Sequence, residues 1–92
     1  MDLKIEHDLE QKKFKAVVDG IESYISYKMQ SPSVMDLEHT VVPKELGGRG
    51  YAAGLTRYVI DYAREHGLKI IPTCPYARAY FEKHPQVKNL LA

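Results

Sequence analysis

The chain has 92 residues, of which 45% are hydrophobic and 27% charged, and its formal net charge is +1. This length allows one domain, residues 1–92, with a core too small to enclose a ligand on all sides. Acidic and basic residues are interleaved without a strong basic excess, which argues against nucleic acid as a partner.

No stretch of the sequence approaches the ~18 consecutive apolar residues that a membrane-spanning helix needs. The first residues, Met1 to Lys4, also lack the apolar run of a secretory signal peptide. Cys74 is the single cysteine, so the chain cannot form an internal disulfide bond, and one thiol is compatible with a reducing compartment. We therefore predict a cytoplasmic protein that does not associate with membranes.

The first half of the sequence predicts four strands. Apolar and polar residues alternate over residues 3–7, 13–18, 21–29 and 34–42, which is the period of a strand with one buried face. Asp19-Gly20 marks a tight hairpin between the second and third runs. Pro43 ends the fourth run, because proline cannot donate a hydrogen bond to a neighbouring strand.

The fourth predicted strand carries a histidine among its apolar residues. Strict alternation places Met35, Leu37, His39 and Val41 on one face. The opposite face then carries Asp36, Glu38 and Thr40, which we interpret as polar surface. Taken alone, a lone histidine is more often a hydrogen-bonded core or rim residue than a catalytic one.

The second half changes to a helical period. Apolar residues recur at helical spacing from Ala52 to Ala63, and Gly67 is a favourable residue for the end of that helix. Residues 68–72 read as a short apolar strand parallel to the preceding one, and residues 76–83 as a second helix. The order ββββαβα therefore predicts an α/β (α+β) fold with a single mixed sheet.

A glycine-rich loop, Glu45 to Gly50, runs directly into the first predicted helix. Backbone N–H groups at a helix N-terminus can bind a phosphate or pyrophosphate, and Arg49 can add a charged contact. A tight turn without any ligand is equally compatible with the glycines. The loop is not a Walker A motif and lacks the spacing of a dinucleotide fingerprint.

Cys74 follows the second parallel strand and lies near the start of the last helix, where a thiol pKa is lowered. A buried small hydrophobic residue is nevertheless the more common role of a free cysteine. If the two parallel strands are neighbours, His39 and Cys74 both approach the carboxyl edge of the sheet, and a histidine beside a thiol can activate a nucleophile. Tyr76 and Tyr80 can share a helix face, either as packing or with a hydroxyl that protonates a leaving thiolate. One cysteine and scattered histidines predict no metal site.

Three blocks of this sequence, residues 35–43, 45–50 and 70–76, resemble the GNAT acetyltransferase superfamily. The similarity covers nearly the whole chain and is greatest to a small, minimal group of N-acetyltransferase-like proteins of about this length. Gly47 occupies a position where the superfamily usually has Gln or Arg, whereas Gly50 and Ala52 match the later positions of the loop pattern. The chain lacks the extra N-terminal helices and C-terminal strands that form the acceptor site in larger members.

The resemblance implies a GNAT-like mixed sheet that binds acetyl-CoA or CoA as its cosubstrate. The backbone of Val41 and Val42 would pair with the pantetheine arm. His39 and Cys74 match the catalytic pair of the small group, with His39 as general base and Cys74 as nucleophile or as a thiol that lines the cleft. Tyr76 would donate the proton to the leaving group. The residues that would contact the pyrophosphate are Gly48, Arg49, Gly50, Tyr51 and Ala52.

The predicted activity is transfer of acetyl from acetyl-CoA to an amine. The alternative is a CoA or acetyl-CoA binding or sensing module without turnover, and a third is an interaction protein that kept the fold and lost the ligand. We predict a monomer or a weak dimer.

Overall fold

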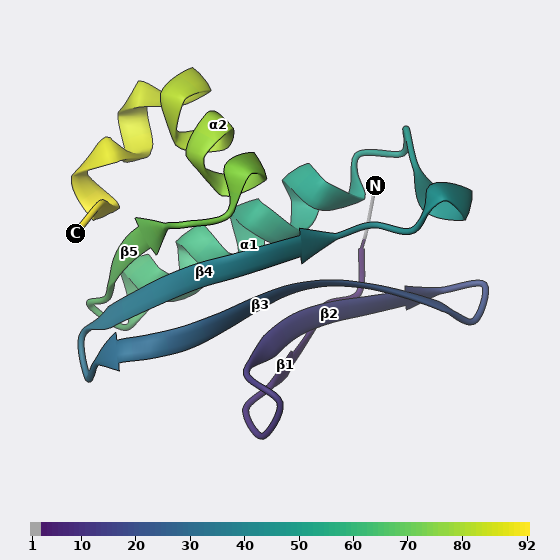
Figure 1. Ribbon diagram of the computed structural model, residues 1–92, viewed down its shortest axis with the longest axis horizontal. Helices are drawn as coiled ribbons and strands as arrows, with labels where there is room; N and C mark the ends of the chain where they lie inside the picture. Colours follow the sequence, from purple (N-terminus) through teal and green to yellow (C-terminus); the bar gives the residue numbers. More distant parts are fainter. Residues whose placement is uncertain (1–2) are drawn as a thin grey trace.

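The computed structural model describes residues 3–92, and its elements follow the predicted order (Figure 1). Its sheet has five strands in the order β1-β2-β3-β4-β5, and β5 is the only strand of these that runs parallel to its neighbour. The α+β mixed sheet predicted from the sequence is therefore confirmed. The bounds are β1 Glu6–Asp8, β2 Lys13–Val18, β3 Ile21–Ser31, β4 Val34–Val41, β5 Lys69–Pro72, α1 Tyr51–Glu65, α2 Pro75–Lys83, and the 3-10 helices η1 Lys44–Leu46 and η2 Pro85–Leu90.

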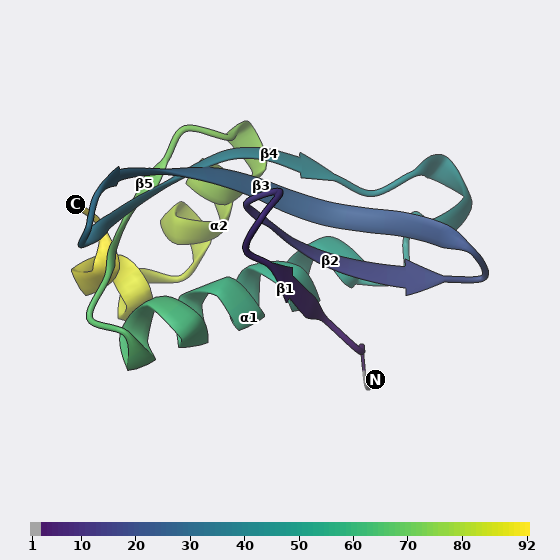
Figure 2. The ribbon, with the colours of Figure 1, turned by 90° about the horizontal axis from the view of Figure 1, so that it is seen from below.

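Both helices cover the same face of the sheet, which leaves the other face open (Figure 2). Leu55, Val59 and Ala63 of α1 are fully buried against Phe14 of β2 and Leu37 of β4. The four-residue spacing of these side chains within α1 puts them on one stripe of the helix, as the sequence predicts. Burying such a stripe against the apolar face of a sheet is the main stabilising contribution in a two-layer domain.

The turns form at the residues that the sequence marks for them. Asp19 and Gly20 both have positive φ angles, 53° and 75°, which is the backbone of the tight turn that joins β2 to β3. Gly67, with φ of 66°, lies just after α1, where a left-handed residue ends the helix. Both predictions are confirmed.

The first strand is shorter and shifted compared with its predicted range of 3–7. Leu3 and Ile5 pack against the core, but pairing with β2 begins only at Glu6. Alternation of apolar residues reports burial of one side of an extended segment, and it does not require that the segment has a hydrogen-bonded neighbour.

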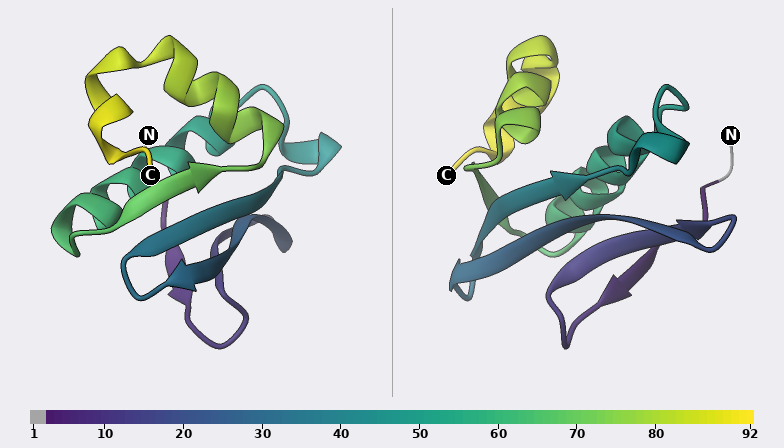
Figure 3. Two further views of the ribbon diagram at one scale, coloured as in Figure 1. Left: turned by 60° about the vertical axis from the view of Figure 1, so that its left-hand side comes forward. Right: turned by 45° about the vertical axis from the view of Figure 1, so that its right-hand side comes forward.

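Strands β4 and β5 pair over only part of β4. The parallel ladder joins Val34 to Leu37 with β5, and the Cys74 N–H then donates to the Leu37 carbonyl at 2.9 Å. After that bond the chain turns into α2, while β4 continues to Val41 beside β3 (Figures 1 and 3). From Glu38 onward, the β5 side of β4 is therefore a strand edge without a β5 partner.

Candidate active site

A β-bulge in β4 decides which side chains face the helices. Glu38 and His39 together oppose Ser26 of β3, and the next pair is Leu37 with Tyr27. An extra residue in one strand changes the phase of the side-chain alternation by one position. Thr40, paired with the fully buried Ile25, therefore lies on the same face as Leu37.

The sequence prediction for these faces is wrong at its last positions. Strict alternation placed His39 with Leu37, but the structure places His39 on the open face, where it is exposed. Thr40 lies on the helix-covered face, and Asp36, predicted as surface, is buried and accepts a 2.5 Å hydrogen bond from the Thr73 hydroxyl. The bulge is the physical reason for the first two differences, because residue alternation cannot show an inserted residue.

Cys74 is a buried residue at the N-cap position of α2. Its Sγ lies 3.3 Å from Oγ1 of Thr40. Burial raises the pKa of the Cys74 thiol. Four hydrogen bonds lower it, from the Thr40 side chain, the N–H groups of Ala77 and Tyr76, and the Thr40 N–H. Together they outweigh burial, so the pKa of the thiol lies below its ordinary value. A thiol held this way has a larger thiolate fraction at neutral pH than an ordinary cysteine.

Cys74 thus contacts Thr40, the residue that follows His39, but His39 itself lies on the opposite face of the sheet. The hydrogen bond of the Cys74 sulfur is to Thr40 and not to the histidine. The structure therefore brings together a thiol, a hydroxyl and a helix N-terminus, with the imidazole on the far side of the strand. The sequence analysis missed Thr40, since a threonine in an alternating strand carries no signal of its own.

The glycine loop adopts the backbone that its composition predicts. Gly48 and Gly50 have φ angles of 75° and 80°, and Gly50 is the N-cap residue of α1. Within residues 3–92 no side chain caps this helix end, and the first turn holds no acidic residue, so these residues leave the N-terminal N–H groups and the helix dipole available to an anion. Arg49 is about half exposed and lies 3.9 Å from the carboxylate of Asp19, a weak surface pair.

A small pocket of about 180 Å³ adjoins this loop. Two arginines, Arg49 and Arg57, contribute to it, and its position beside the N-terminus of α1 favours negative charge. Its lining residues are Leu3, Arg49, Gly50, Tyr51, Gly54 and Arg57. Of the predicted pyrophosphate contacts, Gly48 and Arg49 are exposed in the loop, while Tyr51 is buried and Ala52 is half-buried.

The remaining predicted site residues lie near the point where β4 and β5 part. Tyr76 is the second residue of α2 and is 36% exposed. Burial and the neighbouring Tyr80 raise the pKa of the Tyr76 phenol, with Arg57 acting in the opposite sense, so Tyr76 keeps its proton at neutral pH. Val41 ends β4 and Val42 follows it, so their backbone continues the free strand edge.

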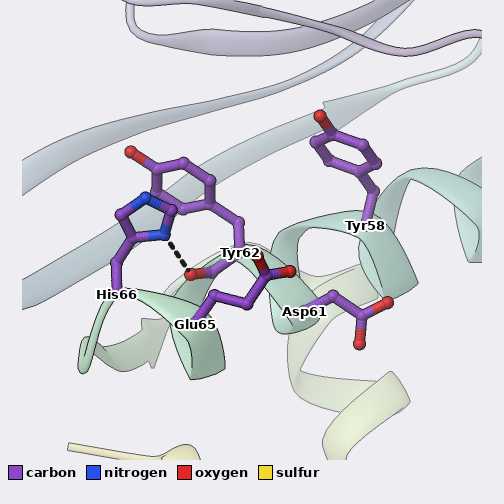
Figure 4. A pocket seen from close by; sticks show the side chains of 5 residues that line it. All are labelled: Tyr58, Asp61, Tyr62, Glu65 and His66. Carbon is purple, nitrogen blue, oxygen red and sulfur yellow. Dashed lines mark hydrogen bonds between the residues drawn. The ribbon is translucent and has the colours of Figure 1, made fainter.

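A larger pocket of about 380 Å³ lies elsewhere, along the C-terminal half of α1 (Figure 4). Its five lining residues are Tyr58, Asp61, Tyr62, Glu65 and His66. Two carboxylates at the C-terminal half of a helix give this pocket a negative potential, because the helix dipole there has the same sign. It is therefore unfavourable for a phosphate-bearing ligand despite its size, and we assign the site to the glycine loop and the β4 edge.

Two further observations concern residues 3–92 as a whole. They contain no group of three or more His, Cys, Asp or Glu side chains arranged to hold a metal ion. Across the same range, neither helix combines the length and the apolar character needed to cross a bilayer.

Four antiparallel strands followed by a glycine loop, a helix and a parallel strand define the GNAT-like class of α+β fold. The chain belongs to the GCN5-related N-acetyl-transferase family, whose sequence profile matches residues 13–90. It is similar to Protein NATD1 of Mus musculus, with 31% identity over 85 residues that cover 90% of this chain and 77% of the mouse protein. Protein NATD1 of Danio rerio is 29% identical over 90 residues, 96% of this chain and 82% of the fish protein.

The fold is also similar to a solved structure. The NMR solution structure of a GCN5-like protein from Staphylococcus aureus superimposes with a TM-score of 0.79 at 30% sequence identity. The match covers 98% of this chain and 88% of that one.

Proposed function

We propose that this protein binds acetyl-CoA between the free edge of β4 and the N-terminus of α1, and that it transfers the acetyl group to an amine. The observation that carries the proposal is the end of the β4–β5 ladder at Leu37, with β4 continuing to Val41. An unpaired strand edge offers N–H and C=O groups to an extended, amide-containing ligand. The pantetheine arm of coenzyme A has this chemistry, and Val41 and Val42 supply the backbone for it.

The glycine loop supports the same position for the coenzyme. The uncapped N-terminus of α1, together with Arg49 and Arg57, attracts an anion. Gly48 and Gly50 carry no side chains, and the space beside each is open, so a pyrophosphate can approach the backbone closely. With the pyrophosphate at the loop and the arm along β4, the thioester would lie near Cys74.

The chemistry proposed for Cys74 is a two-step transfer. The thiolate of Cys74 forms a bond to the acetyl carbon, and the bond from that carbon to the coenzyme sulfur breaks. The departing coenzyme thiolate takes a proton from the Tyr76 phenol. An amine then attacks the acetyl carbon of acetyl-Cys74, gives a proton to the Tyr76 phenolate left by the first step, and returns the sulfur as a thiolate.

Direct transfer is a second candidate, favoured by the exposure of His39 on the open face of the sheet. In that route His39 takes the proton of the amine as it attacks the thioester carbon, and Cys74 only lines the site. Binding or sensing of the coenzyme without turnover needs neither step and remains the alternative. A nucleophilic thiol has to stay reduced, which the cytoplasm allows, so the proposal keeps that location.

A melting experiment with acetyl-CoA tests the proposal. A ligand that binds only the native state stabilises it by about 2.7 kcal/mol when present at ~100 times its dissociation constant. We therefore expect a melting temperature that rises with coenzyme concentration, by roughly 10 to 20 °C at that concentration for a chain of this size. Pantetheine, which lacks the pyrophosphate and the nucleotide, should produce a much smaller rise in melting temperature, because it has no group that can bind the glycine loop. A melting temperature unchanged by saturating acetyl-CoA would reject both catalysis and sensing.

A further inference from the structure

Thr40 is the side chain that contacts the sulfur of Cys74. The two residues come from different elements, β4 and the N-cap of α2, and their Oγ1 and Sγ atoms are 3.3 Å apart. The bulge at Glu38 turns the Thr40 side chain toward the helices, and the bond from the Cys74 N–H to the Leu37 carbonyl fixes the cysteine beside β4. Backbone constraints on both sides thus hold the pair in register.

The hydroxyl of Thr40 can serve both protonation states of the thiol. When the sulfur carries its proton, the S–H donates to Oγ1, as the geometry records. When the sulfur is a thiolate, the hydroxyl proton can rotate and donate to it, because a hydroxyl is both donor and acceptor. The β-branched side chain has few rotamers in a strand, so Oγ1 stays near the sulfur in both states.

The thiolate needs such a partner because the residue is buried. Cys74 is only 4% exposed, and a buried charge is costly unless hydrogen bonds replace the lost water. The N–H groups of Tyr76 and Ala77 face the sulfur from α2, and Thr40 adds its hydroxyl and its own N–H from the other side. The Thr40 hydroxyl is the only side-chain donor among these contacts, so it is the one that a substitution can remove cleanly.

We infer that Thr40 is a positioning residue that orients the Cys74 sulfur and stabilises its thiolate, in place of the histidine that the sequence pattern suggests. The inference deepens the two-step route of the proposed function and rests on it for its catalytic meaning. It assigns to Thr40 no contact with the acetyl group. His39, on the open face of the sheet, then has a role only in direct transfer.

The test measures the thiol without any coenzyme. The rate of Cys74 alkylation by iodoacetamide is followed against pH in the full chain, and the rise in rate reports thiolate formation. In Thr40→Val, which keeps the shape and removes the hydroxyl, the rise moves to higher pH and the rate at neutral pH falls roughly threefold to tenfold. Thr40→Ser, which restores a hydroxyl, returns the profile toward that of the unmodified chain.

Two further variants test whether a shifted alkylation profile arises from altered packing and not from loss of the Thr40 hydroxyl. Thr56→Val also removes a buried threonine hydroxyl, but that hydroxyl bonds the Ala52 carbonyl within α1, so its alkylation profile stays unchanged. Thr40→Ala gives a second chain without the hydroxyl and shifts the profile in the same direction as Thr40→Val. If the profiles of both hydroxyl-free Thr40 variants overlay the original one, Thr40 does not stabilise the thiolate and the inference fails.

The outcomes for the inference and for the proposed function are separable. A shifted alkylation profile in a protein that acetyl-CoA neither stabilises nor acetylates would keep the role of Thr40 and reject the proposed function. An unshifted profile in a protein that binds acetyl-CoA and acetylates Cys74 would reject Thr40 and keep the proposed function.

Discussion

Substituting Cys74 by alanine is expected to abolish formation of a covalent acetyl-protein. Incubation of the unmodified chain with acetyl-CoA should add the mass of one acetyl group, located on Cys74 by peptide mass spectrometry. The proposed nucleophile is the buried thiol at the N-terminus of α2, and no other cysteine is present. Cys74→Ala should show none of this adduct, since alanine offers no nucleophile.

The matched variant for this experiment is His39→Ala. Because His39 lies on the opposite face from the sulfur, its loss should leave the first acetylation of Cys74 nearly unchanged. It should also leave the later release of acetyl to an added alkylamine nearly unchanged, whereas direct transfer with His39 as general base predicts a loss of about 100-fold, the low end of what such a base contributes. Amine acetylation that proceeds at full rate in Cys74→Ala would contradict the two-step route and leave direct transfer.

The substitution Gly50→Val is expected to weaken coenzyme binding by about 10- to 100-fold, the loss that follows when hydrogen bonds to a charged group are prevented. The space beside Gly50 is open in the structure, so the valine side chain does not clash with protein. It occupies instead the volume in front of the α1 N-terminus where the pyrophosphate is proposed to lie. The dissociation constant for acetyl-CoA, measured by calorimetric titration, reports the effect.

A second glycine of the same helix provides the control. Gly50 and Gly67 both have positive φ angles, 80° and 66°, and open space beside the added Cβ, so valine strains the backbone at both, by at least about 1–2 kcal/mol. Gly67→Val should therefore lower stability to a similar degree and leave coenzyme affinity unchanged. Equal affinities for Gly50→Val and the unmodified chain would mean that the phosphates bind elsewhere.

Most of the fold follows from local patterns in the sequence. Alternation in β2, the Asp19-Gly20 turn, the apolar stripe of α1 and the Gly67 helix end each depend on a few neighbouring residues, and each was predictable. The parallel pairing of β4 with β5 also follows, because a strand–helix–strand unit of this length has one favoured handedness. These features required no information about distant contacts.

The candidate site was less predictable because it depends on tertiary contacts. The bulge at Glu38 exists only in the pairing of β4 with β3, and it exchanges the faces of His39 and Thr40. The partner of Cys74 is set by that exchange and by the position of α2, neither of which leaves a mark in the spacing of residues. The glycine loop, in contrast, was predictable as a helix start, because positive φ angles require glycine there.

The proposed transfer depends most on where acetyl-CoA binds, and mapping the backbone amides during a titration tests this position directly. With an isotope-labelled chain, the amide resonances of residues 38–42, 48–52, 74, 76 and 77 should shift together as acetyl-CoA is added, because they line the β4 edge, the glycine loop and the α2 N-terminus. The resonances of residues 58–66, around the acidic pocket of α1, should change least. Shifts confined to that acidic pocket, or no shifts at saturating coenzyme, would contradict the proposed site.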